Sequence, residues 1–334
     1  MICSVRQSNF ELLRIISMLM VLLCHANGYV NQEDMVGAEG VIRVVINQLF
    51  LICVNVFVMI SGWFGIKSSW KGAAALLFQV AFLGTICNLI CAIAGIPVSF
   101  KYNVLPDFLG GYGYWFIVAY LILYALSPAL NKFCESASEK ELRSVVVAFF
   151  GVEFFYGFLL DVGHFDYGFS ALFFIGLYLL ARYVRLYPNR LFTMDKHIDF
   201  GIYLFLSILS MFGLWFGYKW FGMGFHLNHY DSPLAILASL FFLLFFSKLE
   251  IQSRFINWLA ASVFAIYLIH EHSLISQYYS RLFKWLHGEV PLYAYYPLMF
   301  CLLILIGICC ILLDKPRIYV WNSILKISGK KASL

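Results

Sequence analysis

The feature that most constrains this chain is a series of apolar runs, each close to twenty residues long and separated by short polar stretches. A helix rises about 1.5 Å per residue, so about twenty residues cross the ~30 Å hydrocarbon core of a bilayer. Transmembrane β-strands would instead give alternating segments of about ten residues. Because backbone groups in lipid must be bonded internally, the runs predict an all-α, polytopic integral membrane protein.

Composition supports this prediction independently. Of the 334 residues, 62% are hydrophobic and 12% are charged, and the mean hydropathy is +0.83. Soluble domains have roughly 45–50% apolar and about 25% charged residues. The nine cysteines show no C-x-x-C or metal-ligand spacing, so we expect buried packing thiols and no metal site.

We predict about ten transmembrane helices. The fifth and eighth runs are shorter than the others. The spans are Phe10–Val30, Val41–Ile66, Ala73–Ile96, Tyr112–Leu130, Val145–Leu160, Gly168–Leu186, Phe200–Tyr218, Pro233–Ser247, Ile256–Tyr278 and Tyr293–Leu313.

The distribution of basic residues orients these spans. With ten spans and a cytoplasmic N-terminus, only Arg43, Lys101, Lys219, Arg281 and Lys284 of the 23 basic residues fall outside. This asymmetry follows the positive-inside pattern and places both termini in the cytoplasm. The net charge of +5 then indicates contacts with membrane lipids at the inner leaflet, not nucleic acid. We expect one membrane domain over 1–334, with a helical core over 8–317 and a basic cytoplasmic tail over 318–334.

The first span carries the strongest candidate pair, Arg14 and His25. Eleven helical steps turn about 1100°, so both side chains share one face, roughly 16 Å apart along the axis. A guanidinium suits phosphate binding, and an imidazole suits proton transfer near neutral pH. The pair therefore fits a long anionic cofactor whose reactive end lies near His25. The alternative is structural, with Arg14 anchoring the helix end and His25 bonded in the core.

Five short elements follow one another along the chain. They are Asn9–Arg14 with His25, Phe57–Trp63 followed by Lys67 and Lys71, Tyr114–Phe116 with Tyr120 and Pro128, Ser232–Pro233, and Ala265–His270. In this order they resemble acyltransferase family 3, which is marked by an arginine and a histidine with ten residues between them. The resemblance covers about residues 8–317.

The resemblance implies an enzyme that transfers an acyl group, usually acetyl, from acyl-CoA to a hydroxyl of a cell-envelope glycan. It implies a multi-pass protein of the bacterial cytoplasmic (inner) membrane, with acetyl-CoA as donor and a glycan or lipid-linked glycan as acceptor. A homo-oligomer remains open. His25 corresponds to the catalytic histidine, and Arg14 to the paired arginine on the CoA side.

The resemblance gives roles to further residues, and polar side chains within the spans suggest others. Lys67 and Lys71 lie where the family often has arginines, and with Ser61 they are assigned to the CoA side. Lysines are point charges rather than bidentate forks, which departs from the family pattern. The acceptor or oxyanion side is assigned Asn55, Trp115, Tyr120, Glu153 and His270.

Several polar residues keep two interpretations. Glu153 lies in the fifth span, where it could position the histidine or serve a structural role. His270 and His272 are two positions apart, which on a helix turns them about 200° from each other and disfavours a shared metal. His226 and His229 precede the eighth span, where a solvated loop or a glycan contact is expected rather than zinc.

Two other functions compete with acyl transfer. One is a transporter or flippase for a lipid-linked saccharide or small solute, although paired hydropathic halves are not evident. The other is a non-catalytic assembly or sensor subunit, against which the intact histidine argues. For an enzyme, acyl-CoA is cytoplasmic whereas mature glycans are outside. Either the acyl group crosses the protein, or a lipid-linked precursor is acylated on the inner side.

Overall fold

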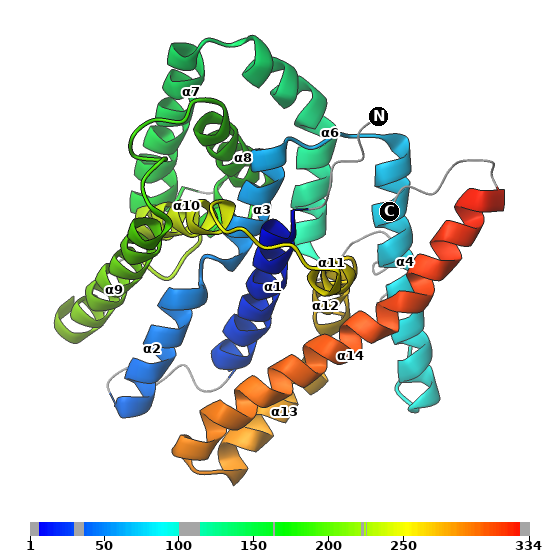
Figure 1. The fold of residues 1–334 in the computed structure, drawn as a ribbon. Coiled ribbons are helices and arrows are strands. Elements are labelled where there is room, and N and C mark those ends of the chain that lie inside the picture. Colours follow the sequence, from blue (N-terminus) through cyan, green and yellow to red (C-terminus); the bar gives the residue numbers. More distant parts are fainter. Residues whose placement is uncertain are drawn as a thin grey trace. The chain divides into compact units, whose positions relative to one another are not determined.

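A computed structural model describes residues 7–29, 37–99, 114–162, 164–221, 224 and 226–327. Within these ranges all regular structure is helical (Figure 1), which confirms the all-α prediction. Among the described residues, seven helical segments are long and apolar enough to cross a membrane: Ser8–Gly28, Glu39–Phe64, Trp70–Ile93, Trp115–Ser136, Glu139–Leu159, Lys196–Phe221 and Leu292–Ile327. The protein is therefore a multi-pass membrane protein.

The remaining predicted spans fall on shorter helical segments. The sixth coincides with α8 (Ala171–Leu186), and the eighth with α10 (Pro233–Ser247). The ninth span was predicted to continue to Tyr278, which is wrong. Helix α12 (Phe264–His270) ends at His270, and an amphipathic helix, α13 (Ser276–Glu289), follows after a turn.

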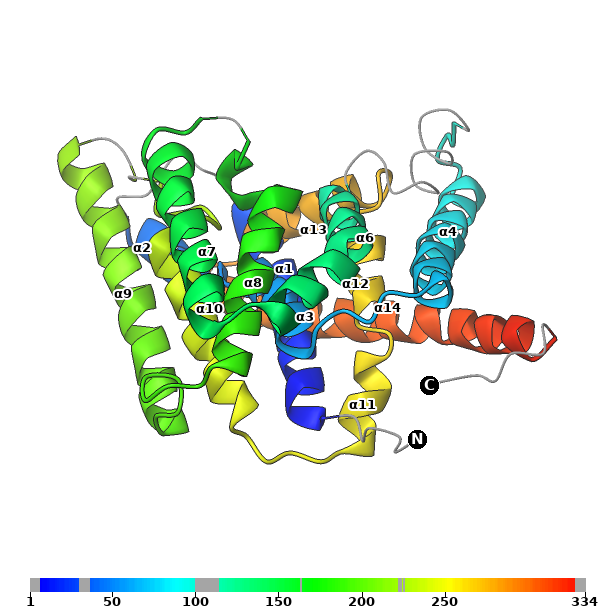
Figure 2. The same cartoon turned by 90° about the horizontal axis from the view of Figure 1, so that it is seen from above.

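The first compact unit comprises Met1–Lys67 and Phe116–Ile256. Its helices are α1 (Ser8–Tyr29), α2 (Ala38–Phe50), α3 (Cys53–Phe64), most of α6 (Trp115–Ser136), α7 (Glu139–Val152), α8, α9 (Lys196–Phe221) and α10. In this unit α3 packs against α1, α8 and α10, and α9 packs against α2 and α10. Figure 2 shows α9 alongside α10, and α7 alongside α8.

Helices α3 and α8 approach each other closely at a glycine. A Cβ atom on Gly62 would lie 2.6 Å from the Tyr178 carbonyl oxygen and 2.9 Å from the Ala181 Cβ. Small residues allow such close backbone approach in membrane proteins, where dispersion contacts between helices replace the hydrophobic effect. Gly62 is thus required by helix packing.

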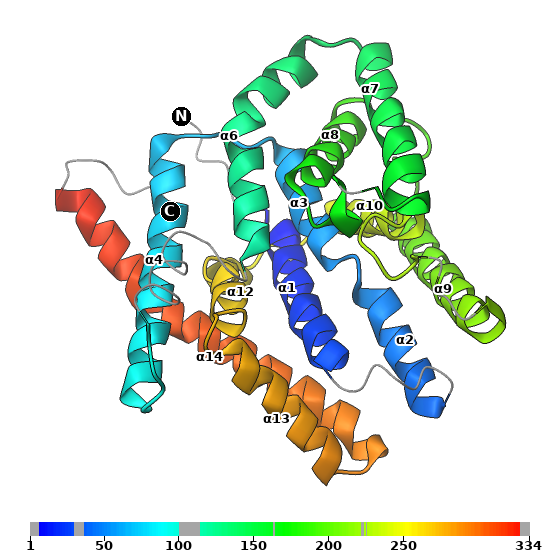
Figure 3. The ribbon, with the colours of Figure 1, turned by 180° about the vertical axis from the view of Figure 1, so that it is seen from behind.

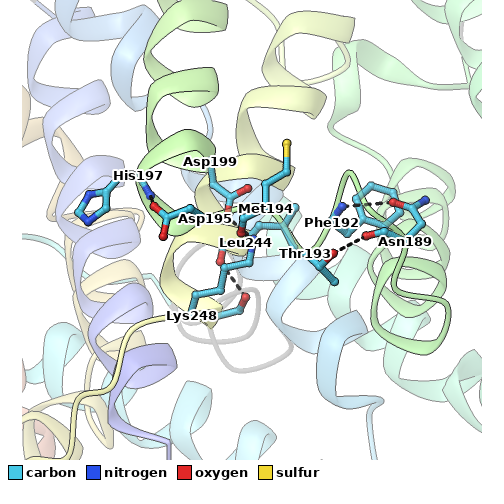
Figure 4. A network of polar contacts seen from close by, with 10 residues as sticks. Asn189, Phe192, Thr193, Met194, Asp195, His197, Asp199, Leu244 and Lys248 are labelled. Carbon is cyan, nitrogen blue, oxygen red and sulfur yellow. Dashed lines mark hydrogen bonds and ion pairs between the residues drawn. The ribbon is translucent and has the colours of Figure 1, made fainter.

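An ion pair with a buried carboxylate joins the start of α9 to the end of α10 (Figure 4). Lys248 Nζ lies 2.5 Å from Asp199 Oδ2 and donates to the Met194 carbonyl oxygen at 2.7 Å. Asp199 is fully buried. The connection before α9 is shaped by Asn189, whose side chain accepts from Leu191 N and Phe192 N.

The second unit comprises Ser68–Trp115 and Asn257–Leu334. Its long helices are α4 (Trp70–Ile93) and α14 (Leu292–Ile327), with α12 packed against both and α13 lying along α14 (Figure 3). Asp314 is fully buried in α14, where Arg317 donates to both of its carboxylate oxygens.

Helix α14 corrects the predicted end of the tenth span. We expected the span to end at Leu313 and a tail to follow from 318, whereas the helix continues to Ile327. Arg317 neutralises the charge of Asp314 inside the helix, and Gln79 Nε2 donates a further hydrogen bond to Asp314 Oδ1 at 3.3 Å. Residues 328–334 lie outside the described ranges.

The glycine contact gives the first testable prediction. We expect Gly62→Ala to lower the melting temperature of the detergent-purified protein, because overpacking at a rigid backbone costs about 1–3 kcal/mol. Gly151→Ala is the matched control, since a Cβ there meets nothing within 4 Å. A melting temperature that falls equally in both variants would contradict the packing argument.

The ion pair gives the second prediction. We expect Lys248→Met to destabilise the protein by about 3–5 kcal/mol, because it leaves the Asp199 charge buried and unpaired. The double variant Lys248→Met/Asp199→Asn should recover much of this loss. Thermal unfolding of wild type, the two single variants Lys248→Met and Asp199→Asn, and the double variant measures the coupling, with Lys140→Met, at an exposed lysine, as the control. Losses that simply add would refute the pairing.

Candidate functional site

Helix α1 carries both Arg14 and His25 without a break, as the sequence predicts. Arg14 Nη1 donates to Glu11 Oε1 at 2.8 Å, with the Arg14 side chain 33% exposed and that of Glu11 10%. One guanidinium nitrogen is engaged there, and the group has five N–H donors in all. Arg14 can therefore bind an anion while it stays paired with Glu11.

Aromatic rings join the start of α1 to the end of α3. Phe10 lies 4.8 Å from Phe64 and 5.9 Å from Trp63, measured between ring centroids. The chain then turns at Gly65, whose φ of 71° favours glycine. We call this end of the first unit the inner end, because α1 begins there and the charge pattern predicts that it is cytoplasmic.

A hydrogen-bond network fixes the chain just before Lys67. Ile66 N donates to Tyr178 Oη at 2.9 Å, Tyr178 Oη donates to Asn131 Oδ1 at 2.6 Å, and Asn131 Nδ2 donates to the Ile66 carbonyl oxygen at 2.8 Å. Both backbone groups of Ile66 are thus satisfied by α6 and α8. The exposed Lys67 side chain follows directly on this rigid support.

Two arginines that the sequence analysis did not single out lie at this inner end. Arg182 is 9% exposed, and its Nε has no hydrogen-bond partner within the described residues. A Cβ on Gly65 would lie 3.1 Å from Arg182 Nη1, which places the guanidinium against the turn. Arg185 is exposed and lies over the Trp63 ring at 5.1 Å. Buried charges in proteins are normally paired, so Arg182 is suited to an anion.

The structure brings Ser61 and Tyr120 together near Arg14. The Ser61 Oγ and Tyr120 Oη atoms are 3.2 Å apart, and Ser61 Oγ also donates to the Phe57 carbonyl oxygen at 3.4 Å. The Arg14 charge acts electrostatically on Tyr120. The inner end therefore combines Arg14, Ser61 and Tyr120 with the two arginines of α8.

Three predicted residues belong to the second unit: Lys71 near the start of α4, Trp115 at the start of α6, and His270.

His270 is buried at the end of α12. Its Nδ1 donates to the Ile266 carbonyl oxygen at 2.6 Å, because a carbonyl can only accept. This bond fixes the ring, and Nε2 lies 3.5 Å from Glu271 Oε1. His272 lies beyond the helix, so the helical argument about the two histidines does not apply.

Two motif elements of the second unit contact each other. Tyr114 is buried, and its Oη donates to the Leu268 carbonyl oxygen at 2.7 Å. Its ring lies 6.0 Å from that of Tyr267. The aromatic element before α6 and the element that ends at His270 therefore form one packed group.

Asn55 and Glu153 lie toward the end of the first unit opposite the inner end. Asn55 Nδ2 donates to the Tyr230 carbonyl oxygen at 2.8 Å, and Asn55 is fully buried. Glu153 is buried at the start of a π-helical segment, η2 (Glu153–Leu159), and interacts electrostatically with Asp231. π-Helical turns occur frequently at functional sites. Both predicted residues thus lie with the segment that precedes α10.

The segment before α10 is exposed at His226, as expected, and buried at its other end. His226 is exposed and His229 half-buried, but Tyr230, Asp231 and Ser232 are buried. Burial raises the pKa of Asp231 to about 6 against its ordinary value of 3.8. The polar sequence indicated exposure, whereas the contact with Asn55 draws the chain inward.

The fold and the inner end define a helical membrane protein with cationic side chains gathered at one end of its first unit. A family model described as an acyltransferase domain matches residues 7–314. The chain therefore belongs to acyltransferase family 3, and acyl transfer is its general activity. The comparison with curated proteins gives no match, and neither does the comparison with solved structures.

Asp231 gives a prediction for stability. Its raised pKa means that the folded state disfavours the charged carboxylate, so this contribution lowers stability as pH rises from about 4 through 6. Glu153, Asp161, His226, His229 and Tyr167 are the titratable groups around it. We expect Asp231→Asn to be more stable than wild type at pH 7.5 by roughly 2 kcal/mol.

Melting temperatures across pH measure this effect. The gain should shrink as pH falls toward 4, where both proteins carry a neutral group at this position. Asp166→Asn, at an exposed aspartate, should show no gain at either pH. An Asp231→Asn protein that melts below wild type at pH 7.5 would show that the carboxylate is paired.

Proposed function

We propose that this protein transfers an acyl group, acetyl first of all, from acyl-CoA to a hydroxyl of a cell-surface or lipid-linked polysaccharide. It would do so as a multi-pass protein of a bacterial cytoplasmic membrane. The observation that carries the proposal is one helix, α1, which holds Arg14 at the cationic inner end and His25 near its other end. Family membership supplies the acyl-transfer chemistry.

The inner end would bind the phosphates of CoA. Arg14 and Arg182 offer guanidinium forks, which bind phosphate oxygens through two parallel hydrogen bonds. Lys67 would add a point charge, and Ser61 with Tyr120 would add hydroxyl groups. Lys71, in the second unit, stays a proposal for the CoA side. The buried arginine of α8 compensates for lysines at positions where the family often has arginines. The thioester would then extend along α1 toward His25.

His25 would act as general base. It would take the proton of the acceptor hydroxyl while that oxygen forms a bond to the thioester carbonyl carbon. The C–S bond then breaks, and the imidazolium returns the proton to the leaving thiolate. Alternatively the imidazole would accept the acyl group before the hydroxyl does. Trp115, Glu153 and His270 stay proposals for positioning the acceptor, and Asn55 supports the chain beside it.

Acetyl-CoA binding and turnover by the purified protein test this function. We expect Arg14→Ala and Arg182→Gln each to weaken acetyl-CoA binding about 10-fold or more, because each removes a charge-assisted phosphate contact. We expect His25→Ala to keep binding but to lose turnover by roughly 100-fold or more. Arg143→Gln and His164→Ala, both at exposed positions, should match wild type.

Each negative result of this experiment would contradict a different part of the proposal. A folded wild type that binds no acyl-CoA would contradict the enzyme proposal and favour transport of a saccharide. A His25→Ala variant with most of its turnover would remove that residue from the mechanism. Unchanged binding in Arg182→Gln would confine the phosphate site to Arg14 and the lysines.

A further inference from the structure

The segment between α9 and α10 enters the first unit rather than covering it. Three side-chain bonds hold it: Gln48 Nε2 donates to Asn228 Oδ1 at 3.2 Å, Asn55 Nδ2 donates to the Tyr230 carbonyl oxygen at 2.8 Å, and His226 Nδ1 donates to the Phe158 carbonyl oxygen at 3.0 Å. The segment therefore follows a defined path from the exposed His226 to the buried Ser232.

Helix geometry places the buried end of this segment at the depth of His25. Helices α1 and α10 pack together, and Asn9 Nδ2 donates to the Phe246 carbonyl oxygen at 2.9 Å, so the start of α1 lies beside the end of α10. Measured along the helix axes from this contact, His25 lies about 24 Å from Asn9 in α1, and Pro233 lies about 20 Å from Phe246 in α10. The residues just before Pro233 thus reach the depth of the candidate catalytic imidazole.

Buried polar atoms without hydrogen-bond partners gather at this place. Within the described residues they include both carboxylate oxygens of Asp231, together with Ser232 Oγ, Asn55 Oδ1, Glu153 Oε1 and His229 Nδ1. We call these five residues the Asp231 cluster. Ser232 precedes the first residue of α10, yet its hydroxyl does not cap that helix. Leaving such atoms unsatisfied costs about 1–3 kcal/mol each, so the cluster is suited to a ligand.

The chemistry of the cluster indicates what the ligand offers. Three of its side chains present oxygens that only accept in their ionised or amide-oxygen form, so they need donors. Hydroxyl groups donate to carboxylates, and they accept from Ser232 as well. A cation would also suit the carboxylates. The cluster, however, also contains the amide of Asn55, the hydroxyl of Ser232 and the imidazole of His229, which suit a ligand with several neighbouring hydroxyl groups better.

An aromatic rim accompanies the cluster. The ring centroids of Tyr167 and His229 are 4.2 Å apart, and those of Phe169 and Tyr230 are 5.0 Å apart. Tyr167 Oη donates to Asp161 Oδ2. Aromatic side chains offer an apolar face together with a polar edge. This combination suits a sugar ring, which has C–H faces and hydroxyl edges.

We propose that the Asp231 cluster binds the hydroxyl groups of the acceptor sugar, entering from the end of the first unit opposite the inner end. This rests on the proposed acyl transfer and names the acceptor subsite within it. Asp231 and Glu153 accept hydrogen bonds from sugar hydroxyls, while Tyr167 packs on the ring. The hydroxyl to be acylated then lies at the depth of His25.

Sugar-stimulated release of CoA from acetyl-CoA tests the subsite. The probes are glucose, galactose, mannose and N-acetylglucosamine, added singly to the purified full-length protein, with acetylated sugar detected by mass spectrometry. We expect at least one probe to accelerate CoA release by wild type. Asp231→Asn and Ser232→Ala should raise the KM for that sugar about 10-fold or more and leave the KM for acetyl-CoA unchanged. Asp166→Asn should match wild type.

A wild type that hydrolyses acetyl-CoA but responds to no sugar would overturn the subsite and leave the proposed function standing. So would an Asp231→Asn variant with a wild-type KM for the sugar, or stimulation by sodium or calcium ions in place of sugars. If wild type does not turn over acetyl-CoA, the proposed function fails, and sugar-dependent melting decides the subsite alone. A bound probe should then raise the melting temperature of wild type but not of Asp231→Asn.

Discussion

The structure depends on one constraint, that polar groups inside a bilayer must be bonded within the protein. The constraint accounts for the helices, and it makes each polar side chain within them informative. Several are paired: Asp199 with Lys248, Asp314 with Arg317, and the side chains of Asn131 and Tyr178 with the backbone of Ile66. Exceptions in the described part of the first unit include Arg182 Nε at the inner end and the Asp231 cluster at the other end.

These two exceptions have complementary chemistry. The inner end presents guanidinium groups, which bind anions, and the Asp231 cluster presents mostly hydrogen-bond acceptors, which bind donors. Helix α1 connects them, with Arg14 beside the first and His25 at the depth of the second. An acyl donor with a phosphorylated end and a sugar acceptor with hydroxyl groups match the two ends in that order. In this arrangement the acyl group need not be handed between separate domains.

The sequence predicted the helices well because hydropathy is a local property. It failed where long-range contacts decide the outcome. The predicted tenth span ends at Leu313, whereas α14 continues to Ile327, and Gln79 of the distant α4 donates to its buried Asp314 together with Arg317. Arg182 was passed over because its environment depends on the packing of α3 against α8. The pair Arg14 and His25 could be found from spacing alone, but the Asp231 cluster could not, since a polar loop gives no sign that it turns inward.

Sidedness tests the central claim most directly. Purified protein would be reconstituted in vesicles of one orientation, with acetyl-CoA supplied on one face and a stimulating sugar on the other. We predict acetylated sugar only when acetyl-CoA is on the face where α1 begins and the sugar is on the opposite face. Transfer only when both are on the face where α1 begins would contradict an acceptor site at the Asp231 cluster.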